Sequence, residues 1–241
     1  MTPASDMTPA SGADGGAGRT APDYPVFLSL AGRPCLVVGA GPVATRKSQG
    51  LVEAGATVTV VAPGTSPAMD ALVEAGSVAL ERRPYRDGEA AAYDLVVTAT
   101  GATLVDEAVI DDARSAGVPV NGADGDRPGT VRLPAVLRRG AVTVAVATGG
   151  TSPALARWLR DRIARSLPPG LETLAALVEE ARSEVRASGQ ATDSVDWAGL
   201  LDGVVLPLVE EERIDEARGA LRDAWLQSGL ETGRPPTGAP G

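Results

Sequence analysis

The chain has 241 residues, a net charge of −9 at pH 7, no histidine and a single cysteine. This length is sufficient to bury a sizeable core, whereas the negative charge speaks against nonspecific binding of nucleic acid. Without histidine there is no imidazole base or His-ligated zinc, and one cysteine excludes an internal disulfide or a cysteine metal cluster, so we predict no resident metal site.

Both ends of the chain have the composition of disordered tails. Residues 1–23 are small and polar and contain "MTPAS" twice, and residues 229–241 are rich in proline and glycine. The first segment lacks the basic start and the continuous apolar run of a secretory signal, and no apolar run of about 18 residues indicates a membrane span. We therefore expect a cytoplasmic protein without a membrane partner.

Residues 24–130 alternate between apolar runs and helical patterns, which is typical of an α/β fold. Several apolar runs are continuous and rich in β-branched residues, as in a parallel sheet that is covered on both faces. We predict a Rossmann-type doubly wound parallel sheet, with Cys35 packed as a small apolar residue in its first strand. The expected strands are 35–38, 57–61, 78–81, 95–98 and 118–121, and the expected helices are 43–54, 67–75 and 105–116.

The stretch "LVVGAGPVATRK", Leu36 to Lys47, places Gly39 and Gly41 between the first strand and the first helix. Such a turn brings backbone N–H groups and the positive end of a helix to one point, where a phosphate can bind. The third position of the pattern is Ala44, an accepted variant, and the following strand completes a βαβ unit. The turn therefore predicts a dinucleotide site, against the alternative of a tight turn that binds no ligand.

The strand at 57–61 is not followed by the usual partner of the adenosine ribose. An NAD site commonly has Asp or Glu at this place, but the sequence continues with Ala62, Pro63 and Gly64. No arginine stands there for a 2′-phosphate, so these residues do not choose between NAD and NADP. We expect the backbone around Pro63 and Gly64 to cover the adenosine.

The stretch "TVRLPAVLRRGAVTVAVATGG" predicts short strands that either extend the sheet or pair with a second subunit. The next motif, "TGGTSP", ends in a strong helix start, with Ser152 as N-cap and Pro153 at the first helical position. Two glycines before a capped helix make a second candidate anion site.

Arginine is concentrated in this part of the chain. Between Arg127 and Arg165 there are eight arginines and one acid, Asp161. Because charges are screened over about 8 Å at physiological salt, a local basic surface can attract an anion although the whole protein is negative. Arg157 and Arg160 share a helical face and can grip carboxylates bidentately, which predicts a compact polyanionic partner. The alternatives are a solvated helix face and contact with an acidic partner subunit.

Residues 169–228 are predicted to form a helical part, broken near 188–194 and at Pro207. Apolar residues such as Leu174 and Leu177 recur at helical spacing, which favours packing or dimerisation. No catalytic pattern stands out in this part of the sequence.

Two acids follow the fifth expected strand, in "VPVNGADGDRPGT". Asp124 lies just past the carboxyl end of this strand, where ligands bind in open α/β sheets. Asp-Gly and Asp-x-x-Gly are also common turn sequences. Sequence spacing alone favours a role in turn formation over a catalytic role for Asp124 and Asp126.

Together these stretches resemble the precorrin-2 dehydrogenase and sirohydrochlorin ferrochelatase family, the Rossmann-type enzymes of siroheme biosynthesis. The likeness runs from residue 24 to 167, with a looser helical likeness after that. Together with the sequence patterns, it predicts an NAD-binding Rossmann domain at 24–130, a dimerisation and substrate-binding segment at 131–168 and a helical C-terminal domain at 169–228. The motifs that carry it are "CLVVGAGPVATRK", "LVEAGATVTVVAP", "DLVVTAT", "VNGAD" and, most specifically, "VAVATGGTSPALARWLRDRI".

The resemblance also implies roles for individual residues. It makes Asp124 the catalytic aspartate, against the spacing argument, and leaves open whether the carboxylate accepts a proton or stabilises positive charge. The cofactor contacts that we expect are Gly39, Gly41, Pro42, Val43, Pro63, Gly64 and Thr100. The expected substrate contacts are Asn121, Thr148, Gly149, Gly150, Thr151, Ser152, Arg157 and Arg160.

The activity implied is NAD-dependent dehydrogenation of precorrin-2 to sirohydrochlorin by a homodimer, with ferrous iron as a candidate second substrate for insertion into sirohydrochlorin. Precorrin-2 carries many carboxylates and so matches the polyanion that the arginines predict. No methyltransferase domain follows, so we expect another protein to perform the methylation. The alternatives are a non-enzymatic Rossmann module that senses NAD(H) and a dehydrogenase for another polyanionic metabolite.

Overall fold

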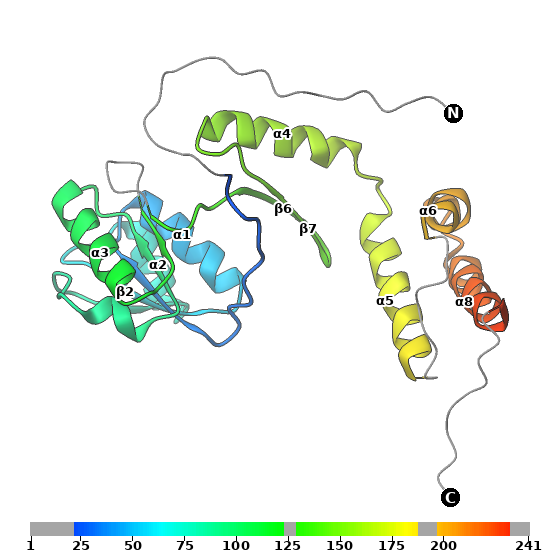
Figure 1. Ribbon diagram of the computed structural model, residues 1–241, viewed down its shortest axis with the longest axis horizontal. Coiled ribbons are helices and arrows are strands. Elements are labelled where there is room, and N and C mark those ends of the chain that lie inside the picture. Colours follow the sequence, from blue (N-terminus) through cyan, green and yellow to red (C-terminus); the bar gives the residue numbers. More distant parts are fainter. Residues whose placement is uncertain (1–21, 123–128, 188–196, 232–241) are drawn as a thin grey trace, which may run out of the picture. The chain divides into compact units, whose positions relative to one another are not determined.

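The computed structural model describes residues 22–122, 129–187 and 197–231 (Figure 1). The chain forms two compact units, which meet in the sequence between Val118 and Pro119. The first contains the glycine turn, and the second contains the arginine-rich segment and the C-terminal helices. No helix in these ranges is long and apolar enough to cross a membrane.

Five strands form one sheet in the order β3-β2-β1-β4-β5. Parallel pairs join β1 to β2, β1 to β4 and β2 to β3. This is the strand order of a Rossmann sheet, and it confirms the predicted doubly wound architecture. The strands are β1 (Pro34–Val38), β2 (Thr57–Val61), β3 (Ala79–Glu81), β4 (Leu95–Thr98) and β5 (Val120–Asn121), the last being shorter than predicted.

Burial explains why these strands lack polar alternation. Cys35, Leu36 and Val37 of β1 and Val96 and Val97 of β4 are fully buried, so residues that point to opposite faces of the sheet are all apolar. Burial also raises the pKa of the Cys35 thiol, which therefore stays protonated at neutral pH.

Helices α1 (Pro42–Glu53) and α2 (Pro67–Glu74) begin within one residue of their predicted starts, whereas α3 (Thr103–Ser115) begins two residues before its predicted start. Helices α1 and α2 each have proline in the first turn, where its missing N–H is not needed. Ser66 caps α2 by accepting a hydrogen bond from the backbone N–H of Met69. A short 3-10 helix, η1 (Glu89–Ala92), precedes β4, and α3 follows it.

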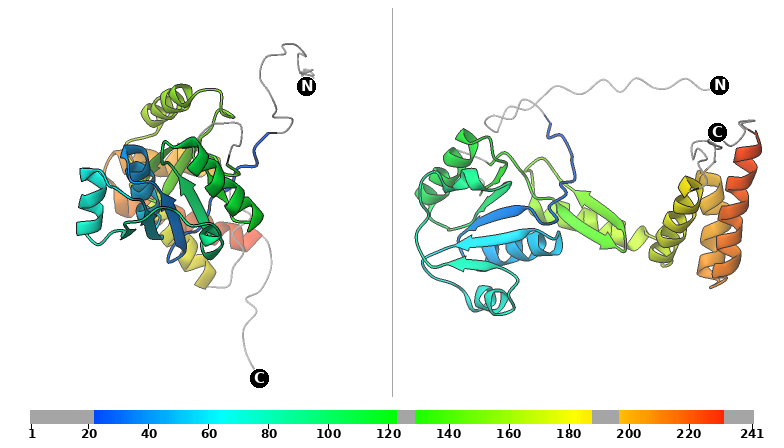
Figure 2. Two further views of the ribbon diagram at one scale, coloured as in Figure 1. Left: turned by 90° about the vertical axis from the view of Figure 1, so that its left-hand side faces the viewer. Right: turned by 90° about the horizontal axis from the view of Figure 1, so that it is seen from below.

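Strands β6 (Ala135–Arg139) and β7 (Val142–Val146) form a separate antiparallel hairpin. They pair with each other, so the alternative in which they extend the parallel sheet is wrong, and pairing with a second subunit stays a prediction. The hairpin turns at Gly140, whose φ of 55° favours glycine. Helix α4 (Pro153–Ser166) packs against both strands (Figure 2).

The C-terminal helices enclose a core of their own, with α5 and α8 side by side (Figures 1 and 2). Leu177, Val205 and Leu221 are buried in this core. The rings of Trp197 and Trp225 meet edge to face, with their centroids 4.9 Å apart. The elements are α5 (Leu171–Ala187), α6 (Trp197–Leu200), the π-helical turn η2 (Leu201–Val205), α7 (Leu206–Glu210) and α8 (Ile214–Glu231).

The predicted helix break at Pro207 is wrong. Pro207 lies in the first turn of α7, and η2 runs directly into that helix. Proline is accepted at this junction because the π-helical turn directly before it already departs from the α-helical hydrogen-bond pattern. The chain turns instead at Glu212, which has a φ of 59°. The other predicted break, 188–194, lies outside the described residues.

Candidate cofactor and substrate sites

Three loops meet at the carboxyl ends of β1, β2 and β4. The N–H of Gly39 donates to the carbonyl of Val61 at 2.9 Å, and the N–H of Ser66 donates to the carbonyl of Ala40 at 3.1 Å. A Cβ atom built at Gly39 would touch Ala99 in the loop after β4. This edge, between the neighbouring strands β1 and β4, is where open α/β sheets bind ligands.

Glycine is required at position 39. The φ of Gly39 is 107°, which side-chain-bearing residues rarely adopt. A Cβ atom here would lie 2.4 Å from the carbonyl oxygen of Ala99 and 3.0 Å from the backbone nitrogen of Thr100. Any larger residue would therefore push the glycine turn away from the loop after β4.

The start of α1 is open to a ligand. Its N-cap, Gly41, makes no side-chain capping bond, and the first turn contains no acid. No atom lies within 4 Å of a Cβ built at Gly41. Pro42 has no N–H, so the free donors of this helix end begin at Val43, whose side chain is half exposed. The positive helix end and its open approach fit the pyrophosphate of a dinucleotide.

The loop after β2, which contains Pro63 and Gly64, is tied to the start of α1. The hydroxyl of Thr45 donates to the carbonyl of Gly41 at 3.0 Å and lies 3.3 Å from the hydroxyl of Ser66. No atom lies within 4 Å of a Cβ built at Gly64. The structure thus brings Pro63 and Gly64 together with Gly39 and Gly41.

Thr100 is held by Asp106, a residue that the motifs did not single out. Asp106 lies in the first turn of α3 and is buried. Its Oδ1 accepts hydrogen bonds from the Thr100 N–H at 3.1 Å, from the Thr100 hydroxyl at 2.8 Å and from the Thr98 hydroxyl. Asp106 therefore fixes the loop after β4. The signal that could have found it is an acid in a first helical turn that follows a Thr-x-Thr loop.

A second missed residue is Arg82, which follows β3 directly. Because β3 pairs with β2, Arg82 lies beside the loop after β2. Its Nη1 donates to the hydroxyl of Thr65 at 3.1 Å, and its Nη2 donates to Oδ1 of Asp70 at 3.1 Å. The Thr65 hydroxyl donates to the same Asp70 oxygen at 2.7 Å. The expected register of two adjacent parallel strands would have predicted this cluster.

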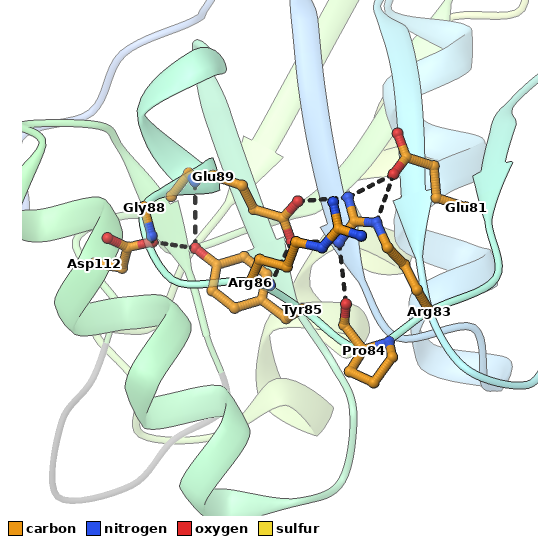
Figure 3. Close-up of polar contacts among 9 residues, drawn as sticks. Glu81, Arg83, Pro84, Tyr85, Arg86, Gly88, Glu89 and Asp112 are labelled. Atoms are coloured by element: carbon orange, nitrogen blue, oxygen red, sulfur yellow. Dashed lines mark hydrogen bonds and ion pairs between the residues drawn. The ribbon is translucent and has the colours of Figure 1, made fainter.

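Figure 3 shows the contacts that hold the chain beyond Arg82. The guanidinium of Arg83 donates to Glu81 at 2.7 Å and to Glu89 at 2.6 Å, and the Tyr85 hydroxyl donates to Asp112 of α3. Burial and the neighbouring Asp112 raise the pKa of Tyr85, so its hydroxyl remains a donor. Burial alone would raise the pKa of Glu89, but hydrogen bonds from Arg83 and a backbone N–H outweigh it and lower the pKa.

Asp124 lies outside the described residues, but the residues on both sides of its segment are described. Gly129 packs against β5, where a Cβ would lie 2.4 Å from the carbonyl oxygen of Val120. Asn121 is buried, and its Nδ2 donates to the carbonyl of Val131 at 2.8 Å. Its Oδ1 has no hydrogen-bond partner among the described residues. The two flanks of the Asp124 segment are therefore held together at β5.

The predicted helix start at Ser152 is confirmed. Its hydroxyl accepts a hydrogen bond from the N–H of Leu155 at 3.2 Å. The Thr148 hydroxyl donates to the Ser152 carbonyl at 3.1 Å and lies 3.3 Å from the Ser152 nitrogen. Between them, Gly149 and Gly150 have φ values of 61° and 88°, with no atom within 4 Å of a built Cβ. This turn presents backbone without side-chain cover, which is compatible with an anion site.

The two arginines predicted to bind substrate have different surroundings. Arg157 is exposed and forms no ion pair within the described ranges. Arg160 donates to the carboxylate of its neighbour Asp161 at 2.6 Å, so part of its charge is already compensated. Arg162 stacks over the ring of Trp158 at 5.7 Å. Thr151, before the helix, is exposed.

The strand order and the three-loop site define a Rossmann-type nucleotide-binding protein. A family model described as "Putative NAD(P)-binding" matches residues 26–135, and one described as "Sirohaem biosynthesis protein central" matches residues 139–166. The chain is 39% identical over 211 residues to a siroheme synthase of Thioalkalivibrio sulfidiphilus, a match that covers 87% of this chain and 43% of that protein. It is 37% identical over 205 residues to a siroheme synthase of Methylococcus capsulatus, covering 84% of this chain and 43% of the relative.

The chain is thus similar to siroheme synthases over most of its own length, and it spans less than half the length of these curated relatives. The resemblance that the sequence motifs indicated is confirmed. Its fold also matches a solved structure of SirC, a precorrin-2 dehydrogenase, with a TM-score of 0.62 at 24% identity, covering 85% of this chain and 98% of that chain.

Proposed function

We propose that this chain oxidises precorrin-2 to sirohydrochlorin with NAD as the hydride acceptor. One observation carries the proposal: the chain that forms the three-loop site is also 39% identical over 211 residues to a siroheme synthase. The arginine-rich segment supports it, because a substrate with many carboxylates requires a cationic surface within a protein of net charge −9.

The described residues supply binding and orientation. The start of α1 would hold the pyrophosphate, since its N–H groups carry no side-chain cap. Asp106 would keep the loop that carries Thr100 at a fixed distance from Gly39. The chemistry that bound NAD supplies is acceptance of a hydride, so the other product of the oxidation is a proton.

Asp124 would provide the carboxylate for this proton or for the positive charge that hydride loss leaves on the macrocycle. Both roles need the ionised form of the carboxylate. An ordinary aspartate has a pKa of about 3.9 and is ionised when the pH lies above this value. When the proton comes from a pyrrole N–H group, which exchanges with solvent, a solvent deuterium isotope effect on kcat separates the two roles, because only proton acceptance moves that proton in the transition state.

The test compares Asp124→Asn with Asp126→Asn in NAD-dependent oxidation of precorrin-2, followed by the absorbance change. We expect kcat/KM to fall by at least about 100-fold in the first variant and to change by less than about threefold in the second. Binding of NAD, measured by calorimetry, should stay within about twofold in both. A fully active Asp124→Asn variant would remove the catalytic assignment.

The NAD(H)-sensing alternative and the alternative acidic substrate have their own outcomes. NAD binding without precorrin-2 turnover in the unmodified chain would favour sensing, and protection from thermal unfolding by a different anion would favour another substrate.

Iron insertion is proposed as a separate activity. It is tested by incubating the protein with sirohydrochlorin and ferrous ions without NAD, and no metallated product above the spontaneous rate would exclude it.

A homodimer is also proposed. It is supported by the exposed apolar side chains of α4, since Leu155 is 42% exposed and Trp158 is 53% exposed. Sedimentation equilibrium of the unmodified chain measures its mass directly, and a monomer at every accessible concentration would contradict this proposal.

A further inference from the structure

The loop after β2 occupies the place where Rossmann proteins read the adenosine ribose. An acid at this place binds the ribose hydroxyls in NAD sites, and an arginine nearby accommodates the 2′-phosphate of NADP. Here β2 ends at Val61, and the following residues Ala62, Pro63 and Gly64 have no polar side chain. The groups that read the 2′ position must therefore come from elsewhere in the chain.

The cluster of Thr65, Asp70 and Arg82 supplies such groups. Thr65 comes directly after Gly64, Asp70 lies in the first turn of α2, and Arg82 follows the adjacent strand β3. The three side chains are joined by hydrogen bonds of 2.7 Å and 3.1 Å. They remain accessible to a ligand, because the side chains of Arg82 and Asp70 are 58% and 39% exposed.

Two features hold Arg82 in this position. The ladder between β2 and β3 pairs Val61 with Glu81, the residue before Arg82. Arg83, the residue after it, is anchored to Glu81 and Glu89, and its side chain is only 19% exposed (Figure 3). The N–H of Arg83 donates to the carbonyl of Glu81 at 3.0 Å, so the chain turns at Arg82, and the bonds of Arg82 to Thr65 and Asp70 fix the direction of its side chain.

Charge decides which ribose this cluster accepts. The hydrogen bond from Thr65, together with Arg82, lowers the pKa of Asp70, so the carboxylate is ionised at neutral pH. Its charge compensates that of Arg82, which leaves a neutral pair. A ribose 2′-hydroxyl can hydrogen-bond to such a pair without cost in charge, whereas a 2′-phosphate would meet the Asp70 carboxylate.

We infer that Thr65, Asp70 and Arg82 form the part of the site that reads the 2′ position of the adenosine ribose, and that Asp70 selects NAD over NADP by occupying Arg82. The inference rests on the proposed function only in that the chain binds a nicotinamide dinucleotide. It does not depend on the identity of the oxidised substrate.

The test measures binding rather than turnover. Calorimetry with ADP-ribose and with 2′-phospho-ADP-ribose gives a preference for each variant, expressed as the ratio of the two dissociation constants. The variants are Asp70→Asn, Arg82→Gln and, as a matched control, Asp94→Asn. Asp94 also pairs with an arginine, Arg33. The side chains of Asp94 and Arg33 are 35% and 59% exposed, which is close to the values for Asp70 and Arg82. The pair of Asp94 and Arg33 stands at the opposite edge of the sheet, because the Asp94 N–H bonds the first residue of β1.

We expect the unmodified chain to prefer ADP-ribose by at least about 10-fold, and Asp70→Asn to reduce this preference by about 10-fold through tighter binding of the phosphorylated ligand. Arg82→Gln should weaken binding of the phosphorylated ligand further and leave the dissociation constant of ADP-ribose within about twofold. Asp94→Asn should change neither dissociation constant. A preference for the phosphorylated ligand in the unmodified chain would overturn the inference. An unchanged ratio in both Asp70→Asn and Arg82→Gln would overturn it as well.

The inference and the proposed function can fail separately. If the unmodified chain binds ADP-ribose with the expected variant pattern but does not oxidise precorrin-2, the 2′ reading stands and the proposed activity falls. If it oxidises precorrin-2 with NAD and NADP at equal kcat/KM, the activity stands and the inference falls. If neither ribose ligand binds, both are rejected.

Discussion

At the scale of single residues, the two glycines of the β1–α1 turn have different tasks. Gly39 has a φ of 107° and no room for a Cβ beside Ala99, whereas Gly41 has an ordinary φ of −78° and open space around it. The first glycine therefore serves the fold, and the second leaves the backbone accessible to a phosphate.

A paired substitution separates these tasks. Gly39→Ala should lower the free energy of unfolding by about 2–4 kcal/mol, because the new methyl group collides with the Ala99 carbonyl in a strained backbone conformation. Gly41→Ala should cost less than about 1 kcal/mol of stability but weaken NAD binding by about 10-fold. Urea unfolding and calorimetry measure the two effects. Equal stability losses in the two variants would contradict this division.

At the scale of elements, the turn after α7 is a Schellman motif with an unusual residue. The N–H of Arg213 donates to the Leu208 carbonyl at 2.8 Å, and the N–H of Glu212 donates to the Val209 carbonyl at 3.1 Å. The position between helix and exit normally holds glycine, because its φ is positive. Here it is Glu212, with a φ of 59°.

Glu212→Gly should therefore stabilise the second unit by about 0.5–1.5 kcal/mol, since glycine relieves the strain of a left-handed backbone. The midpoint of urea unfolding, followed by tryptophan fluorescence, reports the change. Glu211→Gly is the matched control, because Glu211 has a φ of −85° and glycine there should lower stability by up to about 1 kcal/mol. A loss of stability in Glu212→Gly would show that the side chain contributes more than the strain costs.

The elements also show what the sequence could predict. Gly39, Gly41 and the N-cap Ser152 were predictable because each acts through its own backbone or through residues within one helical turn. The signals for Asp106 and Arg82, an acid after a Thr-x-Thr loop and the register of two adjacent strands, were weaker, because the roles of both residues depend on which loops meet at the edge of the sheet. The role of Pro207 was misinterpreted because the π-helical turn before it, which accommodates the proline within a continuous helical run, is not visible in the sequence pattern.

The substrate side of the site has a similar limit. The cap at Ser152 and the glycines before it follow from local sequence rules. The ion pairs of the two arginines depend on side-chain geometry. Asp161 pairs with Arg160, whereas Arg157 has no ion pair in the described part of the chain. Asp124 rests on the family resemblance alone, since its segment is not described.

At the scale of the whole molecule, acid sensitivity should come in part from Glu89. Its folded-state pKa is lowered, with burial opposing and Arg83 favouring ionisation, and the side chain is 16% exposed. A lowered pKa contributes stability above the unfolded pKa of about 4.3, and this contribution is lost as the pH falls through the folded value.

Glu89→Gln should therefore destabilise the chain by about 1–3 kcal/mol at pH 7, and the difference from the unmodified chain should shrink as the pH falls below the unfolded pKa of about 4.3 and through the lower folded value. Chemical unfolding at a series of pH values measures this difference. The control is Glu179→Gln, which removes an exposed pair with Arg186 and should change stability by less than about 0.5 kcal/mol at every pH. A gap that stays constant down to the lowest pH would mean that packing, rather than charge, is lost in Glu89→Gln.

The tryptophans are distributed unevenly along the chain. Trp158, Trp197 and Trp225 all follow residue 118, whereas Tyr24, Tyr85 and Tyr93 all precede it. Tryptophan fluorescence therefore reports only on the second unit. Trp225, which packs edge to face against Trp197, is buried, whereas Trp158 is exposed. Residues 1–118 contain no tryptophan, so a change of emission when the first unit binds ADP-ribose, which does not absorb in the range of indole emission, would report a change in the second unit.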